Sequence, residues 1–181
     1  MIRGDKIILR AVRESDLDAL FELWSDLELR GENYPMFLPS QVEFRKRFEE
    51  HGLLEENRGT LAVCVGDRVA GVINFYPVLY YAGFELGYIL FHQEDRNRGY
   101  MTEAVQLLSR YLFATKTINR LQIAAFPENA ASKRVALKCG FTFEGTLRGA
   151  VFNGGRYRDV ELYSLLRSET GSAGGQYEQP R

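Results

Sequence analysis

Residues 96–104 read Arg96-Asn97-Arg98-Gly99-Tyr100-Met101-Thr102-Glu103-Ala104 and join a run typical of a strand to an apolar stripe typical of a helix. A chain that leaves a strand, turns on a glycine and enters a helix points several backbone N–H groups at one place, and the helix dipole favours an anion there. Arg96 and Arg98 add positive charge beside that place. The segment predicts a cradle for a phosphate or pyrophosphate, although it lacks both a Walker loop and a Gly-x-Gly-x-x-Gly fingerprint. The alternative is a basic loop that only caps a helix.

The sequence before this segment predicts one strand, two helices and three further strands. Apolar residues at helical spacing follow Ser15 and Ser40, each of which suits an N-cap. From Thr60 the apolar period shortens to that of strands, and Gly66-Asp67 predicts a hairpin turn. The expected strands cover residues 6–12, 61–65, 69–76 and 84–91, and the two helices flank a loop at residues 31–39.

The sequence after the segment predicts alternating helices and strands and then a hairpin. The expected elements cover residues 102–113, 121–125, 130–138, 141–152 and 156–166. Gly140 suits the end of the second of these helices, and Asn153-Gly154-Gly155 predicts the hairpin turn. The order β-α-α-β-β-β-α-β-α-β-β indicates one mixed α/β domain over residues 1–168. The small, polar residues 169–181 predict a flexible tail.

The composition excludes several classes of protein. The chain has 181 residues, 45% hydrophobic and 26% charged, which is typical of a soluble globular domain. No apolar run approaches the roughly 20 residues of a membrane span, and no apolar segment follows the N-terminal charges as in a signal peptide. The two cysteines, Cys64 and Cys139, predict neither a disulfide framework nor a metal site. We therefore expect a cytoplasmic protein without metal or membrane partner.

The net charge of −1 hides two charged segments. Residues 96–138 carry 8 basic and 2 acidic side chains, a net of +6, whereas residues 14–56 carry 4 basic and 12 acidic side chains, a net of −8. The two segments predict a cationic and an anionic surface, although solvated helix faces would give the same composition. Proteins that bind nucleic acid strongly are more often basic overall, so we expect no nucleic-acid partner.

A second segment, Asn129-Ala130-Ala131-Ser132 followed by Lys138-Cys139-Gly140-Phe141, adds to the first. Asn129 or Ser132 could be no more than a helix cap. In this order and spacing, however, the two segments resemble the GNAT superfamily of N-acetyltransferases, and most of all its branch of ribosomal-protein alanine acetyltransferases. The resemblance covers residues 3–168 and includes further matches at Glu85-Leu86-Gly87-Tyr88, Glu144-Gly145, Tyr157-Arg158-Asp159-Val160 and Tyr163.

The resemblance implies a mostly antiparallel, twisted sheet of about seven strands flanked by helices, with acetyl-coenzyme A (acetyl-CoA) as the donor. It implies that the pantetheine arm of the donor pairs with Leu90 and Phe91 and forms a hydrogen bond with Asn129. It also implies that the pyrophosphate contacts residues of the first segment, namely Arg96, Arg98, Gly99, Tyr100, Met101 and Thr102. The +6 segment suits the several negative charges of coenzyme A.

The sequence departs from the family pattern at three places. Met101 stands where the family usually has Gly or Ala, so its side chain must point away from the cofactor. The span from Glu85 to Arg96 is one residue longer than usual. Ala136 stands where many members have a Tyr that protonates the departing thiolate.

Two residues are the candidates for catalysis. Glu85 suits the base that takes a proton from the amine, because its apolar neighbours in the strand disfavour the charged carboxylate and so raise its basicity. The alternative is a structural carboxylate that accepts hydrogen bonds. Ser132 is the candidate donor toward the sulfur of coenzyme A, as the resemblance to the ribosomal-protein branch implies. A Ser hydroxyl is a weak acid, so a hydrogen bond to the thiolate is expected rather than full proton transfer.

The resemblance places three aromatic residues beside the acceptor: Trp24, Tyr34 and Tyr80. Aromatic residues at helical spacing, Trp24 above all, are also typical of a core. The −8 segment covers the helices on this side and predicts a cationic acceptor.

The sequence as a whole predicts an acetyl-CoA-dependent N-acetyltransferase that works as a monomer or a homodimer. We expect the amine to attack the thioester directly in a ternary complex. The acceptor is a small amine, such as a metabolite or an aminated antibiotic, or a protein N-terminus. Two alternatives remain: a coenzyme A-binding sensor or partner protein without turnover, and nucleic-acid binding through residues 96–138.

Overall fold

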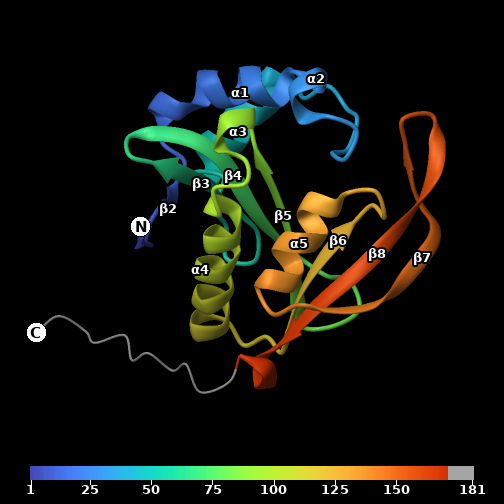
Figure 1. Ribbon diagram of the computed structural model, residues 1–181. Coiled ribbons are helices and arrows are strands. Elements are labelled where there is room, and N and C mark those ends of the chain that lie inside the picture. The colour runs from blue at the N-terminus through green and yellow to red at the C-terminus, as the bar shows by residue number, and fades with distance from the viewer. Residues whose placement is uncertain (171–181) are drawn as a thin grey trace, which may run out of the picture.

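The computed structural model describes residues 1–170, so the expected tail lies outside the described residues from position 171 onward. One mixed sheet of eight strands runs through the domain in the order β1-β2-β3-β4-β5-β6-β8-β7 (Figure 1). The strands are β1 Ile2–Arg3, β2 Ile8–Ala11, β3 Gly59–Val65, β4 Arg68–Pro77, β5 Gly83–Leu90, β6 Arg120–Ala125, β7 Thr142–Asn153 and β8 Arg156–Leu166. The helices are α1 Leu17–Ser25, α2 Leu27–Arg30, α3 Gln41–His51, α4 Tyr100–Thr115 and α5 Ala130–Lys138.

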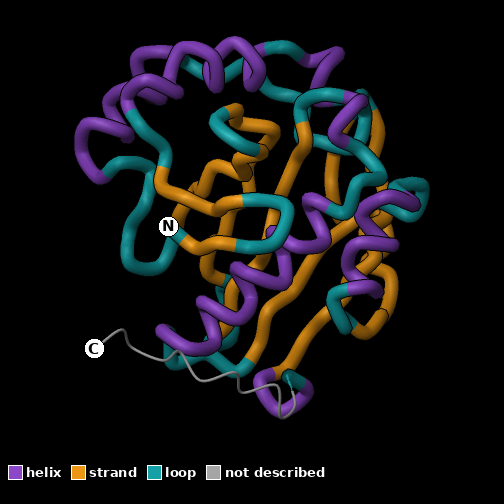
Figure 2. The backbone as a smooth tube through the Cα atoms, turned by 60° about the vertical axis from the view of Figure 1, so that its left-hand side comes forward, coloured by secondary structure: helices purple, strands orange, loops and turns teal. Residues whose placement is uncertain are grey.

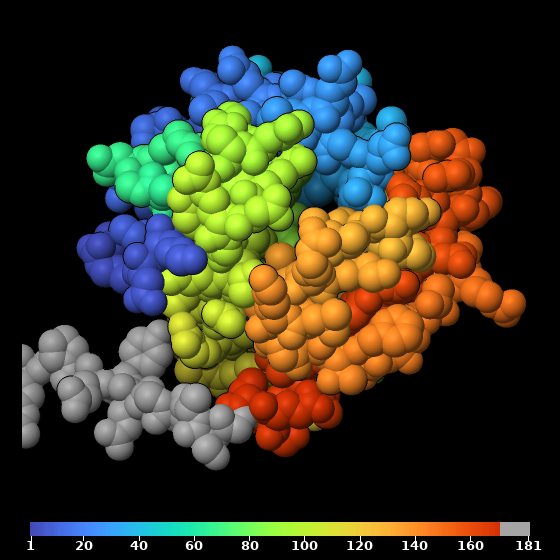
Figure 3. Space-filling view, viewed as in Figure 1, coloured from blue at the N-terminus to red at the C-terminus, as the bar shows by residue number. Residues whose placement is uncertain are grey.

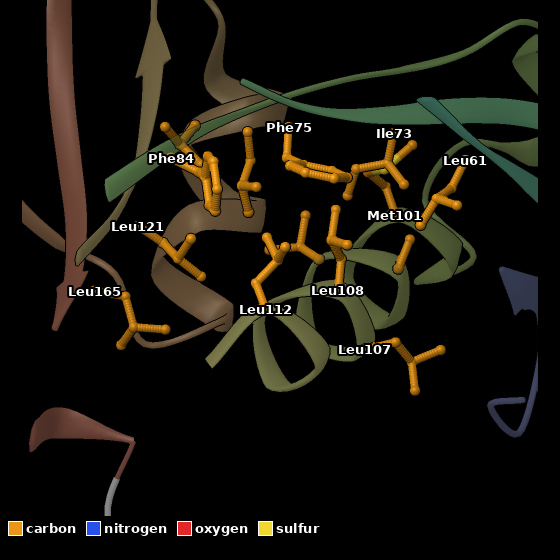
Figure 4. Close-up of a cluster of buried hydrophobic side chains, with 14 of the residues drawn as sticks. Leu61, Ile73, Phe75, Phe84, Met101, Leu107, Leu108, Leu112, Leu121 and Leu165 are labelled. Atoms are coloured by element: carbon orange, nitrogen blue, oxygen red, sulfur yellow. The ribbon is translucent and has the colours of Figure 1, made fainter. Parts of the chain in front are cut away.

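The sheet is covered on both faces because successive side chains of a strand point to opposite sides. On one face, Ile73 and Phe75 of β4 pack against α4 in a large core cluster. Figure 4 shows Leu108 and Leu112 of α4 below these two side chains. On the other face, Val72 belongs to a smaller cluster with residues of α1, and α3 packs against it. The two core clusters thus hold helices against both faces of the sheet.

The predicted order of elements is confirmed, with two additions. A two-residue strand, β1, pairs with β2 and makes the sheet one strand larger than the expected seven. The short helix α2 begins because the side chain of Asp26 accepts a hydrogen bond from the N–H of Leu29 (2.9 Å). The expected N-cap at Ser40 is confirmed, since its hydroxyl accepts from Glu43 N–H (3.3 Å).

The expected N-cap at Ser15 is wrong. A short 3-10 turn, Glu14–Asp16, precedes α1, and the residue at the helix start is Asp16. Its carboxylate accepts from the N–H of Arg13 (2.8 Å) and pairs with the Arg10 guanidinium (2.6 Å). An ionised carboxylate that has both a backbone donor and an arginine is a stronger partner for this turn than a neutral hydroxyl.

Strands β5 and β6 are the only parallel pair of the described sheet, and they separate after a short ladder. The ladder pairs Gly83 with Arg120, Phe84 with Leu121 and Glu85 with Gln122. Beyond the last pair, β5 continues to Leu90 and β6 to Ala125 without pairing to each other. The middle of the sheet therefore opens at one end.

The β7–β8 hairpin reaches across to the loop that follows α2, as Figures 1 and 2 both show. The buried Asn153 near its tip accepts a hydrogen bond from Met36 N–H (2.9 Å) and donates to the carbonyls of Glu32 (3.2 Å) and Tyr34 (3.4 Å). One side chain thus fixes three points of the loop. No helix within residues 1–170 is long and apolar enough to cross a membrane.

The core position of Leu108, which is fully buried, predicts a large loss of stability on truncation. Leu108→Ala is expected to lower the free energy of unfolding by about 2–5 kcal/mol, because a cavity remains under the sheet. Val42→Ala, at a position 79% exposed on α3, is the control and should change it by less than about 0.5 kcal/mol. Urea denaturation followed by circular dichroism measures both, and equal losses would contradict the packing described.

Candidate active site

A cleft of about 750 Å³ opens where β5 and β6 separate. It is bounded by the N-terminal ends of α4 and α5 and by the loop after α2. Figure 3 shows the hollow where the yellow-green α4, the orange α5 and the blue segment after α2 meet. Most of the predicted site residues line it: Tyr34, Glu85, Leu90, Arg96, Gly99, Tyr100, Met101, Thr102, Asn129 and Ser132.

The loop before α4 has the backbone conformation expected of an anion cradle. Asn97 and Gly99 both adopt positive φ angles, 61° and 83°, and the chain then enters α4 directly at Tyr100. The turn leaves the first N–H groups of the helix without helical partners, and residues 99–102 border the cleft. The side chain of Met101 is 5% exposed and packs into the large core cluster, as Figure 4 shows, so only its backbone side can face a ligand.

Two residues predicted to contact coenzyme A lie outside the lining of the cleft. Phe91 is buried in the smaller core cluster on the opposite face, and its N–H donates to the carbonyl of Ala70 (3.0 Å). The Arg98 guanidinium turns back to donate to the carbonyl of Glu94 (2.6 Å). Of the two residues expected to pair with the pantetheine arm, Leu90 lines the cleft and Phe91 does not.

The predicted aromatic residues of the acceptor side occupy three different environments. Tyr34 lines the cleft. Trp24 stands behind it, packed edge-on against Phe44 (5.5 Å between ring centroids) and donating through Nε1 to the Tyr34 hydroxyl (3.4 Å). Tyr80 is 90% exposed in the connection between β4 and β5 and does not reach the cleft.

Glu85 is held by hydrogen bonds from both neighbouring strands. The Tyr76 hydroxyl of β4 donates to its Oε1 (2.6 Å), and Nε2 of Gln122 on β6 donates to its Oε2 (2.6 Å). The Tyr81 hydroxyl donates to the Gln122 carbonyl oxygen, which fixes the orientation of that amide. Burial and the adjacent Glu85 carboxylate raise the pKa of Tyr76 above its ordinary value, so Tyr76 remains a donor at neutral pH.

Ser132 is positioned by the start of α5 and by Tyr88. The Asn129 side chain accepts from Ser132 N–H (3.0 Å) and so forms the N-cap of α5. The hydroxyls of Ser132 and Tyr88 lie 2.9 Å apart. Burial raises the pKa of Tyr88 above its usual value, which keeps its phenol protonated. A tyrosine hydroxyl from β5 is thus present in the cleft, whereas α5 has Ala136 at the position where the family resemblance led us to consider a tyrosine.

The charges of the cleft agree with the expectation for one charged segment and differ from it for the other. Arg96, Arg134 and Lys138 of the +6 segment line it, as expected for an anionic cofactor. None of the acidic side chains of residues 14–56 lines it, and the only charged residue that this segment contributes to the lining is Arg30. The expected anionic surface therefore does not extend into the described cleft.

A family model for the acetyltransferase (GNAT) domain matches residues 6–142. The chain belongs to this family. The GNAT chain is 30% identical to the ribosomal-protein-serine acetyltransferase of Escherichia coli over 175 residues, which cover 90% of this chain and 94% of that protein. It is 31% identical to the uncharacterized N-acetyltransferase p20 of Bacillus licheniformis over 172 residues, 91% of this chain and 95% of the relative.

Solved structures agree with this assignment. RimL, a ribosomal alpha-N-protein acetyltransferase in complex with coenzyme A, superposes with a TM-score of 0.79 at 26% identity and covers 90% of this chain and 95% of its own. The resemblance to the ribosomal-protein branch of GNAT enzymes is confirmed. This GNAT protein is an acetyl-CoA-dependent acetyltransferase.

Sequence reasoning missed the partners of the two catalytic candidates. Tyr76, Gln122 and Tyr88 carry no motif of their own, and their roles depend on strand register. One signal was present for Tyr88, which ends the Glu85-Leu86-Gly87-Tyr88 match and could replace the tyrosine absent at position 136. No signal in the sequence marked Arg30.

The Arg120–Glu144 ion pair, which lies outside the lining of the cleft, predicts a pH-dependent contribution to stability. The Arg120 guanidinium lies 5.3 Å from the Tyr81 ring and lowers the pKa of Glu144 to about 2. A carboxyl whose pKa is lower in the folded protein stabilises it above the pKa of the unfolded chain and loses that contribution as the pH falls. Glu144→Gln should lower stability at pH 7 by less than about 1 kcal/mol, since the pair is partly exposed.

The difference between Glu144→Gln and the unchanged protein should shrink as the pH falls below about 4.5. Urea midpoints at pH 7, 5, 4 and 3 measure it. Glu49→Gln, an exposed carboxyl without an ion pair among the described residues, is the control. A difference that stays constant over this range would contradict the assigned ion pair.

Proposed function

We propose that this enzyme transfers the acetyl group of acetyl-CoA directly to an amine in a ternary complex, with Glu85 as the base and Ser132 as the donor to the departing sulfur. The observation that carries the proposal is that both side chains line the one cleft, where β5 and β6 separate. The acceptor is a small amine or a protein N-terminus.

Both ends of the cleft fit acetyl-CoA, the donor of the acetyl group. The separated strands leave one side of residues 86–90 without a strand partner, which suits the amide groups of a pantetheine arm lying beside Leu90. The N-terminal end of α4 offers free N–H groups to a pyrophosphate, and Arg96, Arg134 and Lys138 supply positive charge. When bound, acetyl-CoA supplies the activated acetyl group.

Glu85 is suited to accept a proton from an amine. An ordinary amine is protonated at neutral pH and must lose a proton before it attacks. The hydrogen bonds from Tyr76 and Gln122 occupy one direction at each carboxylate oxygen, and each oxygen keeps a further lone pair for a substrate proton or a water. Because both partners are strand residues, the carboxylate needs little rearrangement to act.

Ser132 and Tyr88 together form the group that donates a hydrogen bond to the departing sulfur. The Ser132 hydroxyl can accept a hydrogen bond from Tyr88 while it donates its own proton to the sulfur. A hydrogen-bonded pair of hydroxyls stabilises a thiolate better than an isolated serine does, because each bond polarises the next.

The cysteines argue against a covalent acetyl-enzyme. Burial raises the pKa of Cys139 to about 12, and its thiol donates to the carbonyl of Thr102 (3.4 Å) rather than lining the cleft. Burial also raises the pKa of Cys64. A thiol attacks as the thiolate, and neither residue forms one readily at neutral pH. Direct attack by the amine needs no such group.

Glu85→Gln tests the base. The variant keeps the size and one hydrogen-bond acceptor of the side chain but removes its capacity to take a proton, so turnover should fall by about 10²–10⁴-fold. The assay follows thiol release from acetyl-CoA with amine antibiotics, aminoacyl nucleotides, polyamines and N-terminal peptides as acceptors. Affinity for acetyl-CoA should be unchanged. An unchanged rate would reject Glu85 as the base, and a protein without acetyl-CoA affinity would reject the proposed reaction.

Ser132→Ala and Tyr88→Phe test the donor pair. Ser132→Ala should lower kcat by about 10²-fold, because one donor to developing negative charge is lost. Tyr88→Phe should lower it less, since Ser132 remains, and the double variant should resemble Ser132→Ala if Tyr88 acts through the serine. A Tyr88→Phe loss larger than that of Ser132→Ala would show that tyrosine itself is the donor.

A further inference from the structure

Arg30 is a buried cation without a counterion among the described residues. It ends α2, is only 5% exposed and lines the cleft. Its Nη2 donates to the carbonyl of Phe37, whereas Nε and Nη1 have no hydrogen-bond partner. No carboxylate of the described chain lies within 4.0 Å of it.

The other buried charged residues are paired. The buried carboxylate of Asp95 binds the Arg68 guanidinium (2.6 Å), and the buried Arg158 binds the Glu128 carboxylate (3.2 Å). Pairing is the usual state, because a buried charge without a partner loses its hydration and gains nothing in return. Among the buried charges of residues 1–170, Arg30 alone departs from this rule.

Aromatic rings hold the Arg30 guanidinium in place but do not neutralise it. The guanidinium carbon lies 5.6 Å from the centre of the Tyr34 ring and 4.9 Å from that of Phe37. Both aromatic residues also line the cleft. The parallel N–H pairs of a guanidinium are Nε with Nη2 and Nη1 with Nη2, and Nη2 keeps one hydrogen beyond its bond to Phe37. With Nε and Nη1 buried and lacking partners, a planar or tetrahedral oxyanion that reached this guanidinium would satisfy one such pair.

We propose that Arg30 binds an oxyanion, a carboxylate or a phosphate, which the acceptor carries in addition to its amine. The inference rests on the proposed transfer at Glu85, which lines the same cleft. The acceptor is then a small molecule with both groups, because Arg30 lies within the cleft and not at its exposed rim. The proposal replaces the cationic acceptor that the −8 segment predicted. The carboxylates of that segment lie outside the lining of the cleft.

A purely structural role for Arg30 makes a different prediction, and Arg158 supplies the comparison. Both arginines hold the same loop through a carbonyl, Arg30 through Phe37 and Arg158 through Glu32 (2.8 Å). If Arg30 only anchors the loop, Arg30→Met and Arg158→Met should affect all acceptors alike. If Arg30 binds an oxyanion, only Arg30→Met should affect acceptors that carry one.

The experiment compares matched acceptors at saturating acetyl-CoA. One pair is an α-amino acid and its carboxamide, another is an aminoalkyl phosphate and the corresponding amino alcohol, and spermidine and a neutral N-terminal peptide complete the set. In at least one pair the oxyanion should raise kcat/KM by about 30-fold or more, which is the order of effect for a buried charge pair. The pair that shows it identifies the source of the oxyanion.

Arg30→Met should remove this advantage, because kcat/KM falls by about 30-fold or more further for the member with the oxyanion than for the uncharged member. Arg30→Lys should restore part of it, because charge returns without the planar fork. Arg158→Met should preserve the advantage. Circular dichroism and affinity for acetyl-CoA show whether each variant is folded.

Three outcomes would overturn the proposal: equal rates within both pairs, equal losses for both members in Arg30→Met, or the same pattern in Arg158→Met. Where turnover is too slow, calorimetry with coenzyme A present measures the affinity for each acceptor of the same pairs. Equal affinity for both members, or no affinity for either, would likewise reject the role of Arg30. Glu85-dependent acetylation at equal rates for both members of each pair would reject the role of Arg30 and leave the proposed reaction intact. Absence of acetyl-CoA binding would reject the reaction itself.

Discussion

The short parallel ladder between β5 and β6 is the constraint on which the rest of the site depends. Its three residue pairs end at Glu85 and Gln122, and from there the strands separate. Ending the ladder early costs the sheet several backbone hydrogen bonds, which would be unfavourable if the groups stayed buried without partners. The opening therefore makes sense as a slot for a ligand that supplies amide groups of its own.

The same ladder places the proposed base at the vertex of the opening. Because Glu85 and Gln122 form the last pair, their side chains are neighbours by register, and their hydrogen bond follows from backbone pairing rather than from a flexible loop. Tyr76 is the register partner of Glu85 on the other strand and binds its second oxygen. A carboxylate fixed from both sides keeps its position as substrates come and go, which reduces the reorganisation needed during reaction.

Local signals in the sequence predicted most of the fold and the glycine turn that leads into α4. The hairpin at Asn153-Gly154-Gly155, the cap at Asn129 and the glycine turn at Gly99 are short-range features, and each lies where expected. The two-residue β1 and the four-residue α2 were not predicted, because elements this short carry almost no periodicity. The partners of Glu85 and Ser132 could not be predicted because they depend on which strands pair and in which register.

Net charge along residues 14–56 proved a poor guide to the charge of the cleft. A helix presents most of its charged side chains to solvent, so the acidic residues of α1 and α3 contribute to the sum of their segment without facing a ligand. A solvated carboxylate is also screened within about 8–10 Å at physiological salt, whereas a buried guanidinium is screened far less. Of the charged side chains of residues 14–56, Arg30 alone lines the cleft, so the net charge of −8, which includes Arg30, does not describe the charge that a ligand would meet there. A buried charged side chain influences a bound ligand more than an exposed one does, because water and salt screen it less.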